Sequence, residues 1–276
     1  MSDMAGTVIV TGANGSMGSK ACEYLSAKGW DVIMACRTAW KGEPARDRIL
    51  AAHPKAEVRI MQLDLCRKDS IDAFVQELKS SGTKVDALFN NAGILAHGYE
   101  QTEEGLESAL ATNLIGTARL TGSLLPLMSE HARIVNMVSL ACHTGRIRDD
   151  FFCHKDRKYH QIWRYSDSKL GLMLYSLELQ ERLPAMGYPG ISVDVADPGI
   201  VDTKMIALGR WFDPLTDVIF RPLCNSPMKG VTPALHALEA DDRMRYYVGR
   251  SSRDIPRKYI SHPRRKWLME KLTELL

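Results

Sequence analysis

The sequence predicts a doubly wound α/β protein, with a parallel sheet of about seven strands and helices on both faces. Two observations predict it. Short apolar runs alternate with helical stretches along the chain, and the first run is followed directly by a glycine-rich turn. Such alternation is typical of βαβ units, whose parallel strands are joined through helices. We expect one domain over residues 1–276, because no repeat or low-complexity linker divides the chain.

The expected elements follow from the spacing of apolar residues. The run TVIV at residues 7–10 is short and β-branched, which favours a strand, and after residue 17 apolar side chains recur at helical spacing. Strands are expected at residues 7–11, 31–36, 57–63, 86–89, 133–138 and 191–195, with a last edge strand at 246–248. Helices are expected near residues 17–28, 44–53, 68–80, 106–129 and 165–183.

The first turn, TGANGSMG at residues 11–18, has the strand, turn and helix context that a dinucleotide fingerprint requires. Its glycines permit a tight turn and close approach of the backbone. The following helix offers its amino-terminal N–H groups to a pyrophosphate. A glycine-rich turn that binds no ligand is the alternative interpretation.

A second motif, YSDSK at residues 165–169, places Tyr165 and Lys169 one helical turn apart. Side chains at that spacing share a helix face. The lysine ammonium can therefore stabilise a phenolate and lower the pKa of the tyrosine from about 10 toward neutrality. Ser139 precedes the pair, at the end of an expected strand. The same spacing arises by chance in many helices, so the motif gains its weight from the rest of the chain.

Composition argues against several classes of function. The chain has 45% hydrophobic and 25% charged residues and a net charge of +3, which is ordinary for a soluble globular protein and too small to indicate nucleic-acid binding. The six cysteines lack metal-ligand spacing, so we expect buried thiols in a reducing compartment and no metal. Neither a signal peptide nor a transmembrane segment is evident, and we expect a cytoplasmic protein.

Together these motifs resemble the short-chain dehydrogenase/reductase family over most of the chain, which implies a Rossmann domain. The resemblance also rests on DL at residues 64–65, NNAG at 90–93, DPG at 197–199 and Asn113 in the long helical stretch. The segments DVIMACR at 31–37 and RIVNMVSLA at 133–141, and the long interval from Ser139 to Tyr165, look most like the retinol dehydrogenase-like branch.

Two positions depart from the pattern of that family. The phosphate loop of most members has its middle glycine where this chain has Ser16, and here a glycine stands one residue earlier, at Gly15. The residue before Pro198 is Asp197, where relatives more often carry histidine, asparagine or a small residue. The resemblance therefore leaves the path of the loop and the role of Asp197 open.

The resemblance implies four catalytic residues. Tyr165 would exchange a proton with the substrate oxygen, and Lys169 would lower the pKa of Tyr165 and hold the nicotinamide ribose. Ser139 would hydrogen-bond the reacting oxygen, a geometry that stabilises developing negative charge. Asn113 would position a water that links the lysine to solvent, although a buried asparagine bonded to the backbone fits the same pattern.

The resemblance also implies a nicotinamide cofactor, in which Asp64 would contact the adenine, Asn90 the adenosine ribose and Thr203 the carboxamide. The second strand ends in Arg37 with no carboxylate, and Lys41 follows, so we expect NADP(H). The expected cofactor-binding residues are Gly12, Asn14, Gly15, Ser16, Met17, Gly18, Arg37, Asp64, Leu65, Asn90, Ala92, Gly93, Tyr165, Lys169, Pro198, Gly199 and Thr203.

Three further segments are expected to surround the site. Residues 199–230 are rich in apolar and aromatic side chains and would form a lid over a hydrophobic substrate, although helices covering the core have the same spacing. Residues 141–164 form a basic insertion that flanks the catalytic residues, either as a solvated flap or as a site for an anionic substrate tail. Residues 263–276 form an amphipathic helix that packs on the domain, rests on a membrane or joins subunits.

Three functions follow from these expectations. The first is an NADP(H)-dependent oxidoreductase for a hydrophobic alcohol or carbonyl compound of steroid, retinoid or lipid-aldehyde type. The second is a regulatory protein that binds NADP(H) without turnover. The third is an epimerase or dehydratase of the extended branch, suggested by the glycine spacing alone. Relatives commonly associate through helices like those at 106–129 and 165–183, so a homodimer or homotetramer is expected.

Overall fold

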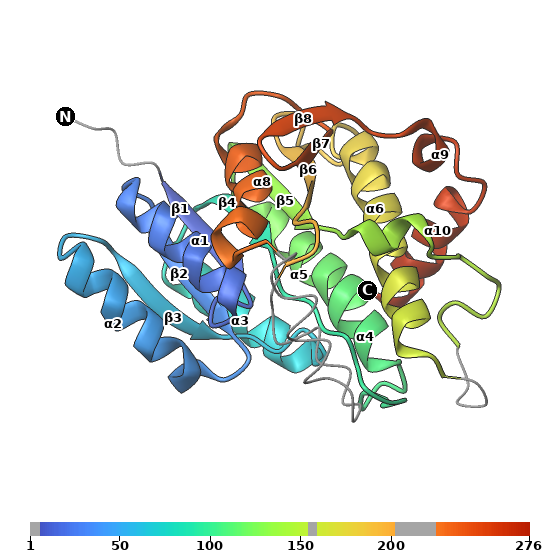
Figure 1. Ribbon diagram of the computed structural model, residues 1–276, viewed down its shortest axis with the longest axis horizontal. Coiled ribbons are helices and arrows are strands. Elements are labelled where there is room, and N and C mark those ends of the chain that lie inside the picture. Colours follow the sequence, from blue (N-terminus) through green and yellow to red (C-terminus); the bar gives the residue numbers. More distant parts are fainter. Residues whose placement is uncertain (1–5, 154–158, 202–224) are drawn as a thin grey trace.

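An eight-stranded sheet forms the centre of the computed structural model, which describes residues 6–153, 159–201 and 225–276 (Figure 1). Its strand order is β3-β2-β1-β4-β5-β6-β7-β8, and every neighbouring pair is parallel except β7 and β8. The strands are β1 (Thr7–Thr11), β2 (Asp31–Cys36), β3 (Val58–Gln62), β4 (Val85–Asn90), β5 (Met128–Met137), β6 (Ser192–Asp197), β7 (Arg245–Val248) and β8 (Ser251–Asp254). The order reverses between β1 and β4, which opens a crevice beyond their carboxyl ends.

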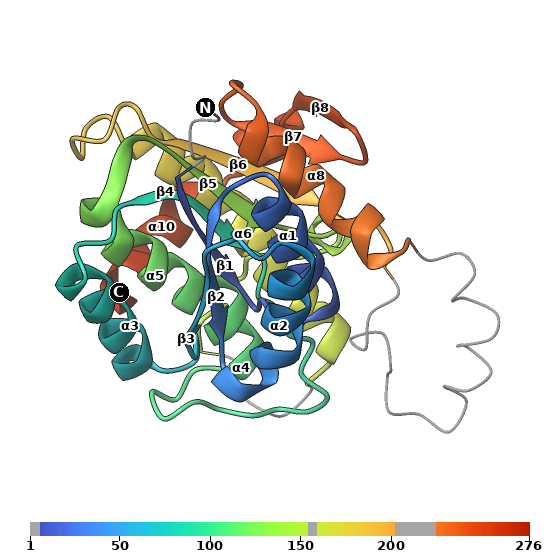
Figure 2. The same cartoon turned by 90° about the vertical axis from the view of Figure 1, so that its left-hand side faces the viewer.

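Helices cover both faces of this sheet, as the alternating pattern predicts (Figure 2). One face carries α1 (Ser16–Ala27), α2 (Glu43–Ala52) and α8 (Pro227–Glu239), whose buried residues form one apolar core with the sheet. The other face carries α3 (Lys68–Ser80), α4 (Ser108–Leu110), α5 (Thr117–Leu124), α6 (Gln161–Arg182) and, at the end of the chain, α9 (Arg257–Ile260) and α10 (Arg265–Leu275). Short turns of tighter or wider helix are η1 (Ala39–Gly42), η2 (Ala111–Gly116), η3 (Leu125–Leu127) and η4 (Leu140–His143).

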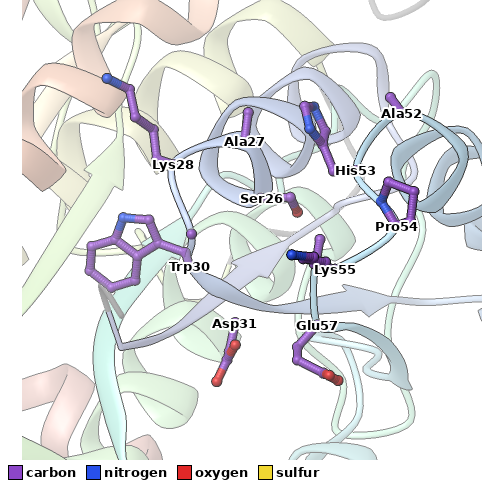
Figure 3. Close-up of a pocket in the computed structure, with 12 residues that line it drawn as sticks. Ser26, Ala27, Lys28, Trp30, Asp31, Ala52, His53, Pro54, Lys55 and Glu57 are labelled. Atoms are coloured by element: carbon purple, nitrogen blue, oxygen red, sulfur yellow. The ribbon is translucent and has the colours of Figure 1, made fainter. Parts of the chain in front are cut away.

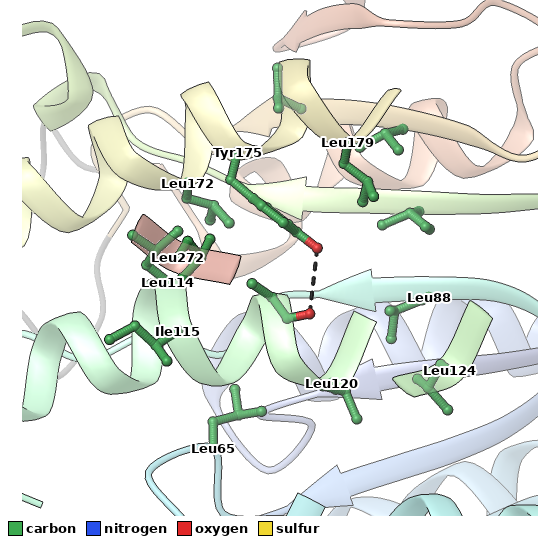
Figure 4. Close-up of a cluster of buried hydrophobic side chains, with 14 of the residues drawn as sticks. Leu65, Leu88, Leu114, Ile115, Leu120, Leu124, Leu172, Tyr175, Leu179 and Leu272 are labelled. Carbon is green, nitrogen blue, oxygen red and sulfur yellow. Dashed lines mark hydrogen bonds between the residues drawn. The ribbon is translucent and has the colours of Figure 1, made fainter. Parts of the chain in front are cut away.

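The larger core lies between the sheet and the pair α5 and α6 (Figure 4). Leu88 of β4 faces Leu120 and Leu124 of α5, and Tyr175 of α6 lies among the leucines with its hydroxyl hydrogen-bonded to Thr121. Each fully buried leucine stabilises the fold by about 1.5–3 kcal/mol. This packing fixes α6, and therefore the position of the YSDSK motif, against the sheet.

The structure corrects two expected elements. The helical stretch expected at residues 106–129 is divided into four pieces, and β5 begins at Met128, five residues earlier than expected. Pro126 in η3 ends the helix because a proline has no N–H to continue it. Strand β8 was not expected, since its sequence, SSRD, is polar and mostly exposed; Gly249, with φ of 59°, lies in the turn that joins it to β7.

The C-terminal helix α10 packs on its own domain, one of the three alternatives that the sequence left open. Leu268 and Leu272 are fully buried against the core of α6. Arg265 forms a salt bridge of 2.7 Å with Glu178 of α6, and Arg119 of α5 donates a hydrogen bond of 2.7 Å to the carbonyl of Leu275. Any subunit contact through this part of α6 would therefore involve α10.

Two negative findings apply to the described ranges. No helix among these residues is both long enough and apolar enough to cross a bilayer. Nor does any group of three histidine, cysteine or acidic side chains there come close enough together to hold a metal ion. Five of the cysteines are free thiols, and Cys224 lies outside the described residues.

Candidate active site

The turn between β1 and α1 has the geometry of an anion site. Gly12 has φ of 63°, and its carbonyl accepts a hydrogen bond of 3.0 Å from the N–H of Gly15, which begins the helix without a side-chain cap. A β-carbon on Gly18 would lie 2.4 Å from the oxygen of Gly12, so only glycine fits there. Ser16 is the exposed first residue of α1. The uncapped N–H groups of this first turn therefore face outward, where a phosphate can bind.

A cavity of about 440 Å³ lies in the crevice beyond β1, β2 and β4 and brings together most of the predicted cofactor-binding residues. Its lining consists of Gly12, Asn14, Gly15, Ser16, Met17, Gly18, Arg37, Thr38, Lys41, Leu63, Asp64, Leu65, Asn91, Ala92, Gly93, Ile94 and Thr112. The turn between β1 and α1 contributes several of these residues, from Gly12 to Gly18. The shape and position match those of a site for an extended nucleotide.

The end of the cavity near β2 is basic. Arg37 and Lys41 are exposed and line it, and none of residues 37–42, which follow β2, is acidic. Asp64 also lines the cavity, but one of its carboxylate oxygens accepts a hydrogen bond of 3.0 Å from the N–H of Cys66 within its own turn. A phosphate on the adenosine ribose would therefore meet two cations at this end.

Asn90, a predicted cofactor-binding residue, is not among the residues that line the cavity. Its side chain is only 2% exposed and donates hydrogen bonds to Thr121 at 3.1 Å and to Asn136 at 2.8 Å. Alternate residues of a strand point to opposite faces, and Asn90 is the last residue of β4 and points into the core beneath α5. The next residue, Asn91, lines the cavity instead.

Two residues that the sequence reasoning missed hold the crevice in shape. The amide of Asn91 donates a hydrogen bond of 2.9 Å to the carbonyl of Thr11, and the hydroxyl of Thr11 accepts one of 2.9 Å from the N–H of Ala92. These bonds join the ends of β1 and β4, which neighbour each other in the sheet. The signal was present in the NNAG motif, whose second asparagine was passed over.

Tyr165 and Lys169 lie together on α6, as their spacing predicts. The Nζ of Lys169 lies 5.8 Å from the centre of the Tyr165 ring and donates a hydrogen bond of 2.8 Å to the carbonyl of Met137, the last residue of β5. A β-carbon on Gly93 would lie 3.2 Å from that Nζ. The lysine therefore extends from α6 to the edge of the nucleotide cavity.

Ser139 lies beside the tyrosine. It follows β5 and caps η4, where its hydroxyl accepts a hydrogen bond of 3.2 Å from the N–H of Ala141. Its side chain also hydrogen-bonds Tyr165. The two hydroxyl groups can therefore reach one substrate oxygen together.

Burial is the largest influence on the pKa values of Tyr165 and Lys169. It raises the pKa of Tyr165, with smaller contributions from Asp197 and Cys142 in the same direction and an opposing one from the hydrogen bond with Ser139. Burial also lowers the pKa of Lys169 to about 8, against the charges of Cys142 and Asp197. The expected lowering of the Tyr165 pKa by Lys169 is not found, because desolvation outweighs the other influences at this position.

Asn113 lies in η2, a turn of π-helix between α4 and α5. Its side chain is fully buried and bonded on both sides: Oδ1 accepts from the N–H of Ile94 at 2.8 Å, and Nδ2 donates to the carbonyl of Ile94 at 2.9 Å and to the hydroxyl of Ser168 at 3.0 Å. It therefore joins the loop after β4 to α6. Turns of π-helix are frequent at functional sites because they redirect one side chain without ending the helix.

The DPG motif ends β6 near Tyr165 and Lys169. Asp197 is fully buried, and Gly199 donates its N–H to Oδ1 at 2.8 Å. Beyond it, Val201 pairs with Asn225, and Asn225 also donates a hydrogen bond of 3.3 Å to the carbonyl of Pro198. Thr203 and the greater part of the predicted lid fall in residues 202–224, outside the described residues.

The insertion at residues 141–164 packs on the domain, apart from residues 154–158, which are not among the described residues. Phe151 is buried against α6, and Phe152 lies 6.2 Å from the ring of Trp267 in α10. Arg164 is 5% exposed and donates a hydrogen bond of 3.0 Å to the carbonyl of Phe151. This arginine is therefore structural, whereas Arg146 and Arg148 are exposed.

Comparison with known proteins agrees with this geometry. The sequence model of the short chain dehydrogenase family matches residues 6–210. The chain belongs to the short-chain dehydrogenase family. This short-chain dehydrogenase is 33% identical to retinol dehydrogenase 12 of Bos taurus over 237 residues, 85% of the chain and 73% of that relative. It is 31% identical to the Mus musculus retinol dehydrogenase 12 over 263 residues, 95% of the chain and 79% of that relative.

Solved structures confirm the Rossmann fold of this short-chain dehydrogenase. An uncharacterized protein from Mycobacterium paratuberculosis superposes with a TM-score of 0.77 at 30% identity, covering 97% of this chain and 93% of the other. A short-chain dehydrogenase from Sphingobium yanoikuyae, solved in complex with NADPH, has a TM-score of 0.66 at 21% identity and covers 98% and 93%. The retinol dehydrogenase-like branch expected from the sequence is confirmed by the curated relatives, and the fold by both structures.

A second cleft, of about 500 Å³, lies at the opposite end of the strands, beyond their amino ends (Figure 3). It is formed by the turns that precede β2 and β3 and includes Trp30, His53 and Lys55. None of the predicted site residues lies there. Ligands of doubly wound sheets bind at the carboxyl ends of the strands, and this cleft lies at the amino ends.

Proposed function

We propose that this short-chain dehydrogenase transfers a hydride between NADP(H) and a hydrophobic alcohol or carbonyl compound, with Tyr165 as the proton donor and acceptor. The observation that carries the proposal is the position of Lys169. Its Nζ lies near both the Tyr165 ring and the backbone of Gly93, and Gly93 lines the nucleotide cavity. One side chain thus connects the proton donor to the cofactor site.

The residues of the cavity suit the proposed cofactor. The first turn of α1 would hold the pyrophosphate, and Lys169 would hold the nicotinamide ribose. A bound NADPH supplies the hydride. Since burial raises its pKa, Tyr165 carries its proton at neutral pH and is ready to donate it to a carbonyl oxygen. Ser139 would accept or donate the second hydrogen bond to that oxygen.

The preference for NADP(H) over NAD(H) is supported by the basic end of the cavity. Arg37 and Lys41 line it, and no carboxylate follows β2 to bind a ribose hydroxyl. An arginine binds phosphate in a planar, two-pronged geometry. The structural relative from Sphingobium yanoikuyae, solved with NADPH, is in keeping with this preference.

An apolar substrate is supported by two exposed side chains near the reacting atoms. Leu140, 43% exposed, follows Ser139, and Ile200, 62% exposed, follows Gly199. Exposed aliphatic groups beside a polar catalytic centre favour a hydrophobic ligand. Curated relatives are named retinol dehydrogenases, so a retinoid, steroid or lipid aldehyde is the class we propose.

We also propose a cytoplasmic location, since the described cysteines are free thiols, as is usual in a reducing compartment. A homodimer or homotetramer stays a proposal. Its interface would include α10, which lies on α6.

The test is the oxidation of NADPH at 340 nm against apolar aldehydes, ketones and ketosteroids, with wild type and Tyr165→Phe. We expect kcat to fall by about 10²–10⁴-fold in the variant, while NADPH still binds. A panel that prefers small sugars or hydroxy acids would contradict the substrate class. Tight NADPH binding without turnover, or turnover indifferent to the substitution, would favour the regulatory alternative.

A further inference from the structure

Asp197 lies fully buried at the carboxyl end of β6, on the face of the sheet that α6 covers. Successive side chains of a strand point to opposite faces. Val193 and Val195 belong to the core beneath α6, whereas Ala196 belongs to the core on the other face. Asp197 therefore points to the same side of the sheet as the catalytic helix.

Both carboxylate oxygens of Asp197 accept hydrogen bonds from neutral donors. The hydroxyl of Tyr246, in the neighbouring strand β7, donates to Oδ2 at 2.7 Å, and the N–H of Gly199 donates to Oδ1 at 2.8 Å. Among the described residues, Asp197 has no salt bridge. No cation of the described residues offsets the charge of this carboxylate, and a charge in a buried site of low dielectric acts strongly over short distances.

Lys169 is the complementary case. Its side chain is 3% exposed, and its Nζ donates to the neutral carbonyl of Met137. Within the described parts of the chain it makes no salt bridge either. Met137 pairs in the sheet with Ala196, the residue before Asp197. The ammonium of Lys169 is bonded at the end of β5, and Asp197 stands at the end of the neighbouring strand β6. Both groups are therefore on the face of the sheet that α6 covers.

The surrounding groups leave Asp197 as the negative charge that acts on the lysine. Burial raises the pKa of the Cys142 thiol to about 11, so that this thiol is neutral at physiological pH. Burial likewise raises the pKa values of the nearby tyrosines and lowers that of His143. The titratable and charged groups around the pair are Cys142, His143, Tyr165, Tyr246, Arg253, Lys258 and Tyr259.

We propose that Asp197 is a positioning residue that serves as the counter-charge of Lys169 and keeps its ammonium group protonated through the neutral range. The proposal rests on the proposed function in one respect, namely that Lys169 binds the nicotinamide ribose. Burial lowers the pKa of Lys169 to about 8, and Cys142 and, to a smaller extent, Asp197 oppose that effect. Without Asp197, the lysine would lose its proton at a lower pH.

The experiment is the pH dependence of the Kd for NADPH, measured by fluorescence on the full chain between pH 6 and 9.5. It needs no substrate and no turnover. For the wild type we expect affinity to fall with a midpoint near pH 8, where Lys169 loses its charge. In Asp197→Asn the midpoint should move to lower pH by about one pH unit. The phosphates of NADPH titrate equally in every variant and cancel in the comparison.

Two controls isolate the charge from the structure. Tyr246→Phe removes a hydrogen bond to Asp197 but keeps the carboxylate, so its midpoint should stay close to that of the wild type. Lys169→Arg should show no midpoint near pH 8, because a guanidinium does not titrate there. Circular dichroism confirms folding, and Asp197→Ser replaces Asp197→Asn if the latter does not fold.

The outcomes are distinguishable. A folded Asp197 variant whose midpoint equals that of the wild type overturns the counter-charge proposal and leaves the oxidoreductase proposal intact. A wild type that does not bind NADPH at any pH contradicts the oxidoreductase proposal itself. An equal shift in Tyr246→Phe would assign the effect to packing and also overturn the proposal.

Discussion

The ammonium group of Lys169 lies against the backbone of Gly93. A β-carbon on Gly93 would lie 3.2 Å from Lys169 Nζ and 3.4 Å from Asn113 Oδ1, closer than most such contacts. We expect Gly93→Ala to displace the flexible end of the lysine and lower kcat/KM by about 10- to 100-fold, since small misplacements of catalytic groups have effects of that size. Steady-state kinetics with NADPH check this, and thermal unfolding shows whether the fold is kept.

Gly98 provides the matched control for that substitution. A β-carbon there would meet no atom within 4 Å, so Gly98→Ala should leave kcat/KM within about twofold of the wild type. Equal losses in both variants would mean that the loop after β4, and not the lysine, is responsible.

Arg37 should decide which cofactor is preferred. Arg37→Asp replaces a phosphate-binding cation with a carboxylate, and we expect the ratio of kcat/KM with NADPH to kcat/KM with NADH to fall by about 100-fold. Arg48, exposed on α2 outside the cavity lining, gives the control Arg48→Asp. If the ratio changes equally in both variants, or in neither, Arg37 does not select the cofactor.

Thr11 should matter for stability and for cofactor binding together. Its hydroxyl accepts a hydrogen bond from the N–H of Ala92, at the edge of the cavity. Thr11→Val leaves that N–H unpaired, which should lower the free energy of unfolding by about 1–2 kcal/mol and weaken NADPH binding. Urea denaturation and fluorescence titration measure the two effects. Thr11→Ser keeps the hydroxyl, and a loss equal to that of valine would show that packing is responsible.

The protonation of Asp194 should make the free energy of unfolding depend on pH. Burial raises its pKa from the ordinary 3.8 of an aspartate to about 6, although Arg133 lies 3.4 Å away. Between those two values the native state holds more protons than the unfolded state, so stability from this residue decreases as pH rises and is lost above about pH 6.

Asp194→Asn removes that titration. The free energy of unfolding of the wild type, minus that of the variant, should fall by about 2–3 kcal/mol between pH 4 and pH 7. Urea denaturation at several pH values measures the difference. A difference that rises with pH would instead mean that the ion pair with Arg133 dominates.

Much of the fold followed from local patterns. The apolar runs predict β1 and β2 with the bounds observed and β6 within two residues, because both faces of these strands are buried and most of their side chains are apolar. Strand β8 and the first half of β5 were missed for the opposite reason. β8 pairs with β7 along its length and the first half of β5 pairs with β4 at Met128, and backbone pairing of this kind cannot be recognised from the polarity of the side chains.

The candidate site divides in the same way. Spacing along one helix predicts that Tyr165 lies beside Lys169. The two side chains are neighbours in the structure. The role of Asn90 stays a prediction: its side chain is bonded to Asn136 in the core, and Asn91, the next residue, lines the cavity. The burial of Asp197 and the π-helix around Asn113 depend on contacts from distant segments, which a local pattern does not encode.

The pairing of Val201 with Asn225 joins the two ends of residues 202–224 at the edge of the catalytic centre. This pairing fixes the two anchor residues of the segment. The entropy cost of closing a loop grows slowly with its length, so a longer segment between the same anchors would cost little more. This short-chain dehydrogenase therefore offers a natural graft site. Residues 202–224 include most of the proposed substrate lid, and we expect their exchange for the corresponding segment of another enzyme to change selectivity while Ser139, Tyr165 and Lys169 stay in place.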